Sequence, residues 1–329
     1  MKISGYFPVG DRCQSTYSVC GTRRGFSHHP EYPASVPDEK GRDKAAKMSN
    51  VTQMEKFIRF RDLHHVVGAF VMPNAWDAGS ARMFAHLGFS AIATTSSGYA
   101  YAVGRRDSFA GLSRDEILDN AASIVCACDL PVSADLEDGF GASPKTCAQT
   151  VDKAVGVGLV GGAIEDATGD ENDPIYPFDA AVERIQAAAD AADGKPFLLT
   201  ARAENYLYGR PDLDDTIRRL QAFSMAGADV LYAPGLPDLK TIETVCREVD
   251  KPVNMLMGSA SFRANIDELS TAGVARISTG GSLAKAGWGA VWRAVQEILV
   301  DGTFAYGVDA MPDSELAAMM SQEKLTKRD

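Results

Sequence analysis

Acidic residues end two apolar stretches of this chain. Asp135 and Glu137 close the run Leu-Pro-Val-Ser-Ala-Asp-Leu-Glu-Asp of residues 130–138, and Glu165 closes a second run, residues 162–165. Side chains alternate faces along a strand, so we expect Asp135 and Glu137 to point the same way. Converging carboxylates repel one another, which predicts a cation between them. Oxygen ligands of this kind favour Mg²⁺, with Mn²⁺ possible.

A third apolar stretch ends in Arg202, two residues before Glu204. This spacing places both side chains on one side of a strand. A guanidinium there could clamp a substrate carboxylate or phosphonate through two hydrogen bonds. The alternative is a structural ion pair of Arg202 with Glu165 or Glu204. Both interpretations stay open.

Other reactive side chains are placed less favourably for chemistry. All five histidines precede the third predicted strand, which disfavours a zinc site and a histidine-based triad, and His64-His65 is expected on a helix surface. The lysines fall away from strand ends, apart from Lys285 after the last strand, so Schiff-base chemistry is disfavoured. Asp138 and Asp166 should point away from the shared face and cap loops or helices.

The elements that position these residues repeat from residue 66 onward. Apolar strand runs alternate with amphipathic helical stretches, and eight such repeats predict an α/β fold, the (β/α)8 TIM barrel, with its active site at the carboxyl ends of the strands. Ser97-Gly98, after the second strand, offers an anion its N–H groups and a hydroxyl, or is a simple turn. The predicted strands are 69–72, 91–95, 132–135, 162–165, 197–201, 230–233, 253–257 and 276–278. The predicted helices are 78–87, 114–127, 147–157, 180–192, 215–226, 238–249, 266–272 and 283–299.

The two ends of the chain fall outside this repeat. Residues 1–50 are rich in Gly, Pro, Ser, Arg and Lys without periodicity, and we expect a disordered N-terminal extension. Residues 51–329 are expected to form the barrel with a C-terminal helical tail. The tail helix, residues 311–325, carries the apolar stripe Leu316, Met319 and Met320, which could pack on a neighbouring subunit.

Composition narrows the class of protein. The 329 residues carry a net charge of −11, and residues 51–329 carry a larger negative charge than the whole because residues 1–50 are net basic. An acidic body argues against nucleic-acid binding and suits a divalent cation. No apolar stretch approaches the roughly 20 residues of a membrane span. The six cysteines form no CxxC pair, and Cys126 and Cys128 lie in an apolar run, which predicts reduced core thiols in the cytoplasm.

Five motifs, in order along the chain, resemble the isocitrate lyase and phosphoenolpyruvate mutase superfamily over about residues 55–300. The resemblance implies a barrel that exchanges its eighth helix with a neighbour, usually in homotetramers, and a chemistry of enolates derived from 2-oxo acids. The motifs are Pro-Asn-Ala-Trp-Asp-Ala-Gly-Ser-Ala-Arg at 73–82, Thr-Ser-Ser-Gly at 95–98, Ala-Asp-Leu-Glu-Asp-Gly-Phe-Gly at 134–141, Ile-Glu-Asp at 164–166 and Ala-Arg-Ala-Glu at 201–204.

The resemblance also implies roles for individual residues. Asp135 would contact Mg²⁺ directly, and three further acids would hold it through water. Catalytic roles fall to Arg202 and Asp107. The three water-linked acids are Asp107, Glu137 and Glu165, and the expected substrate-binding residues are Ser97, Gly98, Tyr99, Arg202 and Asn254.

One loop departs from the resemblance. Residues 166–173 contain no Cys, Lys or His, whereas the lyases carry a Lys-Lys/Arg-Cys-Gly-His motif here and the mutases a Lys-Thr-Asn segment. We expect a Mg²⁺-dependent lyase or hydrolase that cleaves a carbon–carbon bond in a small 2-oxo or 2-hydroxy di- or tricarboxylate, as a 2-methylisocitrate lyase or oxaloacetate hydrolase does. Tyr99, Tyr206 or Tyr232 could donate the proton. A phosphonopyruvate mutase and a noncatalytic carboxylate-binding barrel are the alternatives.

Overall fold

The computed structural model describes residues 51–107, 111–259 and 262–321. These described residues belong to one compact unit. The expected disorder of residues 1–50 concerns residues outside the described part of the chain, as does the end of the predicted tail helix.

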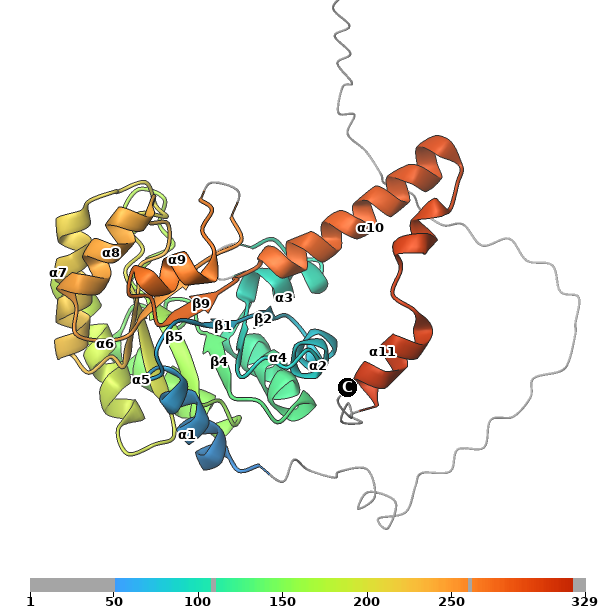
Figure 1. The fold of residues 1–329 in the computed structure, drawn as a ribbon. Helices are drawn as coiled ribbons and strands as arrows, with labels where there is room; N and C mark the ends of the chain where they lie inside the picture. The colour runs from blue at the N-terminus through green and yellow to red at the C-terminus, as the bar shows by residue number, and fades with distance from the viewer. Residues whose placement is uncertain (1–50, 108–110, 260–261, 322–329) are drawn as a thin grey trace, which may run out of the picture. The chain divides into compact units, whose positions relative to one another are not determined.

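Parallel strands form a closed barrel in the order β1-β9-β8-β7-β6-β5-β4-β3-β2, which confirms the predicted fold (Figure 1). The first strand is divided into β1 and β2, so the nine short strands correspond to the eight predicted. The division falls at Pro73, which has no N–H to donate, although its carbonyl still accepts from the Ala93 N–H at 2.9 Å. The strands are β1 (Phe70–Met72), β2 (Asn74–Ala75), β3 (Ile92–Thr94), β4 (Val132–Asp135), β5 (Gly161–Glu165), β6 (Leu198–Arg202), β7 (Val230–Tyr232), β8 (Val253–Leu256) and β9 (Arg276–Ser278).

Asn74 joins the two ends of the sheet. β1 pairs with β9 and β2 pairs with β3, so the first strand bridges the seam of the barrel. The Asn74 side chain accepts from the backbone N–H groups of Thr279 and Gly280, each at 2.9 Å, and donates to the Thr94 carbonyl at 2.7 Å. One buried amide therefore ties the last strand to the third.

Helices surround the barrel and are started by local side-chain caps. Ser113, Ser143 and Asn265 each accept a hydrogen bond from the backbone three residues later, which satisfies an N–H that the helix cannot. The surrounding helices are α2 (Ala78–His86), α4 (Arg114–Ala127), α5 (Pro144–Gly156), α6 (Phe178–Ala192), α7 (Leu213–Met225), α8 (Leu239–Glu248) and α9 (Ile266–Thr271). Cys126 is exposed on α4, so its prediction as a core thiol was wrong, whereas Cys147 is buried.

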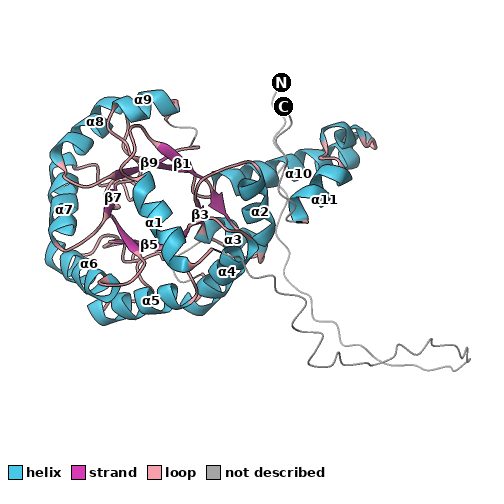
Figure 2. Ribbon diagram, turned by 60° about the horizontal axis from the view of Figure 1, so that its bottom comes forward, coloured by secondary structure: helices cyan, strands magenta, loops and turns pink. Residues whose placement is uncertain are grey.

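A helix absent from the sequence-based prediction, α1 (Gln53–Leu63), crosses the amino-terminal end of the barrel (Figure 2). Phe60 packs against Met72, Ala93 and Leu198 inside the strands. His64, the residue that caps this helix at its carboxyl end, is buried at 7% exposure. The prediction that His64 lies on a helix surface was therefore wrong, because the helix caps the barrel instead of lying on its outside.

The layer between the strands and the surrounding helices is densely packed beside β5. A Cβ added at Gly162 would lie 2.5 Å from Leu136 Cδ1 and 2.8 Å from Phe197 Cζ. Leu136 and Phe197 are themselves buried, so a side chain at this point of β5 would force one or both of them to shift within a packed layer.

The C-terminal helices extend away from the barrel. α10 (Ser282–Asp301) begins over the carboxyl ends of the strands and projects outward, and α11 (Asp313–Met320) returns toward α2 (Figures 1 and 2). Met319 is buried, and Arg82 donates to the Met320 carbonyl at 2.5 Å, so the tail packs on its own chain through α2. Most of α10 stays exposed, including Trp288 and Trp292. In the described part of the chain, no helix is both long and apolar enough to cross a membrane.

Candidate active site

A cavity of about 500 Å³ opens at the carboxyl ends of the strands and reaches down into the barrel. Its lining is mostly polar and comes from nearly every strand. The residues that carry the argument below are Ser96, Ser97, Asp107, Asp135, Glu137, Glu165, Arg202, Glu204, Tyr208, Tyr232, Arg276 and Lys285.

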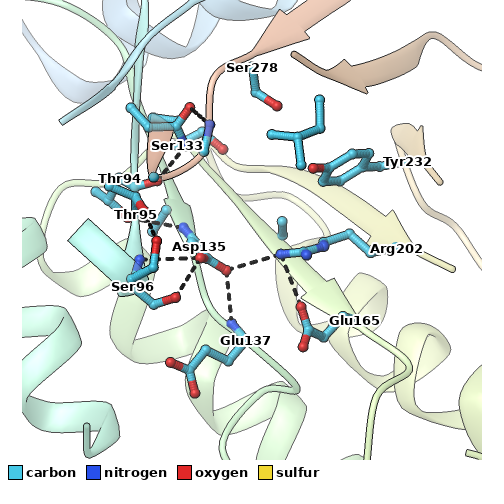
Figure 3. A pocket seen from close by; sticks show the side chains of 18 of the residues that line it. Thr94, Thr95, Ser96, Ser133, Asp135, Glu137, Glu165, Arg202, Tyr232 and Ser278 are labelled. Carbon is cyan, nitrogen blue, oxygen red and sulfur yellow. Dashed lines mark hydrogen bonds and ion pairs between the residues drawn. The ribbon is translucent and has the colours of Figure 1, made fainter. Parts of the chain in front are cut away.

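Arg202 lines this cavity and points toward Asp135 and Glu165 (Figure 3). Its guanidinium contacts three carboxylates: Glu204 at 2.8 Å, Glu165 at 3.0 Å and Asp135 at 3.2 Å. Its Cζ also lies 5.0 Å from the centre of the Tyr232 ring. The structural ion pairs that we left open as an alternative are present, and the same side chain still lines the cavity.

Charge and burial act in opposite directions on Arg202. Burial alone would lower the pKa of Arg202, but Glu165 and Glu204 hold it well above its ordinary value. Register explains the pairing with Glu165, because Glu165 and Arg202 are directly opposite each other on β5 and β6. The result is a permanently charged guanidinium in a fixed orientation.

Asp135 ends β4 and is held on both carboxylate oxygens. Oδ2 accepts from the Ser96 hydroxyl at 2.8 Å and from the Ser96 N–H at 3.3 Å, whereas Oδ1 faces Arg202. The Asp135 N–H donates to Thr94 Oγ1 at 3.0 Å. Figure 3 shows this carboxylate between Ser96 and Arg202, at the point where the predicted substrate and metal residues meet.

Glu137 lines the cavity for a reason other than the one predicted. β4 ends at Asp135, and Glu137 follows in a left-handed turn with φ of +48°. The alternation of side chains along a strand therefore does not extend to it. Its N–H donates to Asp135 Oδ1 at 3.4 Å. Burial, and next the charge of Asp135, raise the pKa of Glu137 to about 8.

Five carboxylates share the cavity with a smaller number of cationic groups. Asp107 comes from the segment after α3 (Ser96–Ala102), and burial followed by the charge of Asp135 raises its pKa, while Lys285 of α10 opposes this. In the described residues, no group of three or more acidic, His or Cys side chains is gathered tightly enough to enclose a metal ion. The oxygen-rich cavity, with its excess of carboxylates, fits a hard cation that is held by few direct protein contacts and by water.

Asp166 and Arg219, which do not line the cavity, hold the backbone of Glu204 in place. The Glu204 N–H donates to Asp166 Oδ1 at 2.8 Å, and Asp166 Oδ2 accepts from Arg219 at 3.0 Å. Asp166 is thus turned away from the cavity, as the sequence predicted. Asp138 is also turned away and pairs with the buried Arg184, which fixes the turn after β4.

The expected substrate-binding residues are only partly gathered around the cavity. Ser97 lines the cavity, whereas the Gly98 N–H already donates to Thr95 Oγ1 at 3.3 Å. Ser97 and Gly98 lie in the first turn of helix α3 and not in a simple turn, and Thr95 caps that helix. Tyr99 packs in a small separate core with Ala100. Asn254 lies deeper in the barrel and does not line the cavity.

Sequence reasoning missed two titratable residues of this cavity, Tyr208 and Arg276. Of the three tyrosines proposed as proton donors, only Tyr232 lines the cavity. Burial raises the pKa of Tyr208 to about 12 and that of Tyr232 further. The other missed residue is Arg276, at the start of β9, where no strand-end signal exists. Lys285, noted from its position after the last strand, is confirmed in the lining.

Comparison with known proteins places these features in a family. A family model described as phosphoenolpyruvate phosphomutase matches residues 60–299. The chain is 33% identical over 222 residues to an uncharacterized protein of Mycobacterium tuberculosis H37Rv, covering 67% of this chain and 81% of that protein. It is 31% identical over 209 residues to the 2-methylisocitrate lyase of Escherichia coli K12, covering 60% of this chain and 69% of that enzyme.

Solved structures agree with these matches. A Burkholderia cenocepacia J2315 protein, described provisionally as a lyase/mutase, is 53% identical with a TM-score of 0.78. The match covers 80% of this chain and 95% of that one. The barrel fold is therefore shared over most of both chains.

Proposed function

Because this chain belongs to the phosphoenolpyruvate phosphomutase family, we propose that it is a carbon–carbon lyase or hydrolase acting on a small 2-oxo or 2-hydroxy di- or tricarboxylate. The observation that carries this proposal is the Arg202 guanidinium, fixed by Asp135, Glu165 and Glu204 inside a carboxylate-rich cavity. The 2-methylisocitrate lyase of E. coli supplies the reaction class by analogy.

The cavity suits Mg²⁺ or Mn²⁺. Asp135 would hold the ion directly, and Asp107, Glu137 and Glu165 would hold it through water. The bound ion would supply positive charge for an oxyanion of the substrate. Burial is the first cause of the raised pKa of Glu137, and the neighbouring charges of Asp135, Asp138 and Asp107 raise it further, a repulsion that a bound cation would relieve.

The chain's own residues would bind and stabilise the substrate. Arg202 donates to the substrate carboxylate or to the oxygen on which enolate charge develops, and its three carboxylate contacts prevent it from turning away. Ser97 adds a hydroxyl at the same rim. Tyr232, against the guanidinium face, is our candidate proton donor, since it lines the cavity and Tyr99 and Tyr206 do not.

The exposed face of α10 supports a homo-oligomer. Trp288, Val291, Trp292 and Val295 lie on one helix and are each exposed by 44–68%. Contiguous apolar surface of this kind marks an interaction site. We assign its partner as a second copy of the chain, with α10 exchanged between barrels, and we place the protein in the cytoplasm because Cys126, Cys128, Cys147 and Cys246 are free thiols.

The test is release of a 2-oxo acid, trapped as its hydrazone, from alkylmalates, methylisocitrate, isocitrate and oxaloacetate, with Mg²⁺ or with EDTA. We expect product that depends on the metal, that is lost in Asp135→Ala and that is kept in Asp119→Ala, a change at an exposed acid on α4. Loss of activity in Tyr232→Phe would support the proton-donor assignment.

The family description also favours a second candidate, a phosphonopyruvate mutase, so phosphonopyruvate belongs in the same panel. Phosphoenolpyruvate formation from it, with no oxo acid from the other compounds, would replace the lyase proposal. Calorimetric binding of carboxylates without product from any compound would indicate a noncatalytic binder.

A further inference from the structure

Arg276 is a buried guanidinium with no acidic partner. Its side chain is 2% exposed, and its hydrogen bonds go to Asn254 Oδ1 at 2.8 Å, Thr200 Oγ1 at 3.0 Å and His64 Nε2 at 3.4 Å. No ion pair among the described residues includes it. Burying an unpaired charge is costly, so this arrangement calls for an anion.

The three acceptors around Arg276 are neutral. His64 Nδ1 lies 2.8 Å from the Phe60 carbonyl, which can only accept, so the ring proton sits on Nδ1 and leaves Nε2 as an acceptor for Arg276. Burial, and next the charge of Arg276, lower the pKa of His64 to about 3, which keeps the ring uncharged. These contacts orient the guanidinium without neutralising it.

Arg276 faces the lower end of the cavity described above. It lines that cavity together with the small residues Ala93, Ser133 and Ala163. Its partner Thr200 precedes Arg202 by two residues on β6, a rise of roughly 6.6 Å along the strand. These three hydrogen bonds use one N–H on each nitrogen of the Arg276 guanidinium and leave one N–H on each of its two terminal nitrogens.

We propose that the floor of the cavity is a second anion subsite, in which Arg276 receives one carboxylate of a dicarboxylic substrate while the opposite end lies at Arg202. This inference rests on the proposed function and adds to it the recognition of the distal carboxylate. A terminal pair of N–H groups matches the two oxygens of a carboxylate.

The test compares matched 2-oxo acids that differ only in the distal group. The pairs are oxaloacetate with 2-oxobutyrate, 2-oxoglutarate with 2-oxopentanoate, and 2-oxoadipate with 2-oxohexanoate. Binding is measured by calorimetry with Mg²⁺, using the pairs that release no product. For at least one chain length we expect the dicarboxylate to bind about tenfold or more tightly than its partner, as a hydrogen-bonded charge pair would provide.

The variants separate the floor subsite from the mouth of the cavity. Arg276→Gln should remove the preference for the dicarboxylate while 2-oxo monocarboxylate binding persists, and Arg276→Lys should restore part of the preference. Asp135→Asn should weaken both members of each pair. Should Arg276→Gln fail to fold, the wild-type comparison alone decides.

Two results would overturn the floor subsite, and both can be distinguished from the result that would overturn the proposed function. Equal affinities within every pair in the wild-type protein would remove the floor subsite and leave the proposed function standing. Chloride that stabilises the wild type but not Arg276→Gln, without a dicarboxylate preference, would identify an inorganic-anion site instead. If no 2-oxo acid binds at all, the proposed function itself fails.

Discussion

Protonation of His64 should make this protein less stable in mild acid. The His64 pKa is lowered from 6.5 to about 3, by burial first and by Arg276 next. Between these two pH values the unfolded chain binds a proton at this position and the folded chain does not. The free energy of unfolding therefore falls as the pH falls below 6.5, by up to about 1.4 kcal/mol per pH unit.

The size of this effect follows from the two pKa values. Between pH 7.5 and pH 5 the contribution of His64 amounts to a loss of about 2 kcal/mol. Carboxyl groups act in the opposite direction: burial raises the pKa of Asp166 to about 6 and that of Glu137 to about 8, so their contribution to stability falls as the pH rises. The contribution of His64 is therefore measured as the difference in the pH dependence of unfolding free energy between the wild type and a variant without His64.

The assay is urea denaturation at pH 7.5 and pH 5, at fixed protein concentration, of the wild type and of His64→Gln, which cannot titrate. The wild type should lose about 2 kcal/mol more than His64→Gln across this range. His65→Gln is the matched control, because the neighbouring ring is exposed, and it should follow the wild type. Equal pH dependence in the wild type and His64→Gln would refute the buried, neutral state of His64 and weaken the description of the cavity floor.

Three further predictions concern other parts of the molecule. Gly162→Ala should lower the free energy of unfolding by about 1–3 kcal/mol in urea, because Leu136 and Phe197 crowd this face of β5, whereas Gly156→Ala, where an added Cβ meets nothing within 4 Å, should change it little. Mg²⁺ should raise the melting temperature more at pH 8.5 than at pH 6.5, because protons on Glu137 compete with the cation, and EDTA or Asp135→Asn should abolish the rise. Trp292→Glu should shift the protein toward monomers in sedimentation velocity, and an unchanged oligomer would show that the exposed α10 face is not the contact.

Local patterns in the sequence were sufficient for most of the fold. Because parallel buried strands are continuous apolar runs, the alternation of apolar runs and amphipathic stretches predicted eight of the nine strands to within one residue at each end and missed β2. α1 was not predicted, because its outer face is polar and because it is stabilised by tertiary contacts, through which Phe60 closes the end of the barrel. α3 was missed because seven small and aromatic residues carry no helical period.

The site was predictable where it depends on strand ends and unpredictable where it depends on distant contacts. Asp135, Glu165 and Arg202 end their strands, so chain order and barrel topology bring them together. Arg276 begins its strand and meets His64 from 212 positions away. No local pattern encodes such a contact, because it arises only when the ring of strands closes over α1.

The seam at Asn74 has a consequence for the order in which the protein can be made. During synthesis β1 and β2 emerge early from the ribosome. Their partners at the seam emerge about two hundred residues later: β9 pairs with β1, and the Thr279 and Gly280 amides bind Asn74. Until then the growing sheet keeps two open edges, which can pair with other chains. Ribosome-bound fragments that end before residue 276 should thus depend on chaperones, and independence should begin only once the β9 segment has left the exit tunnel.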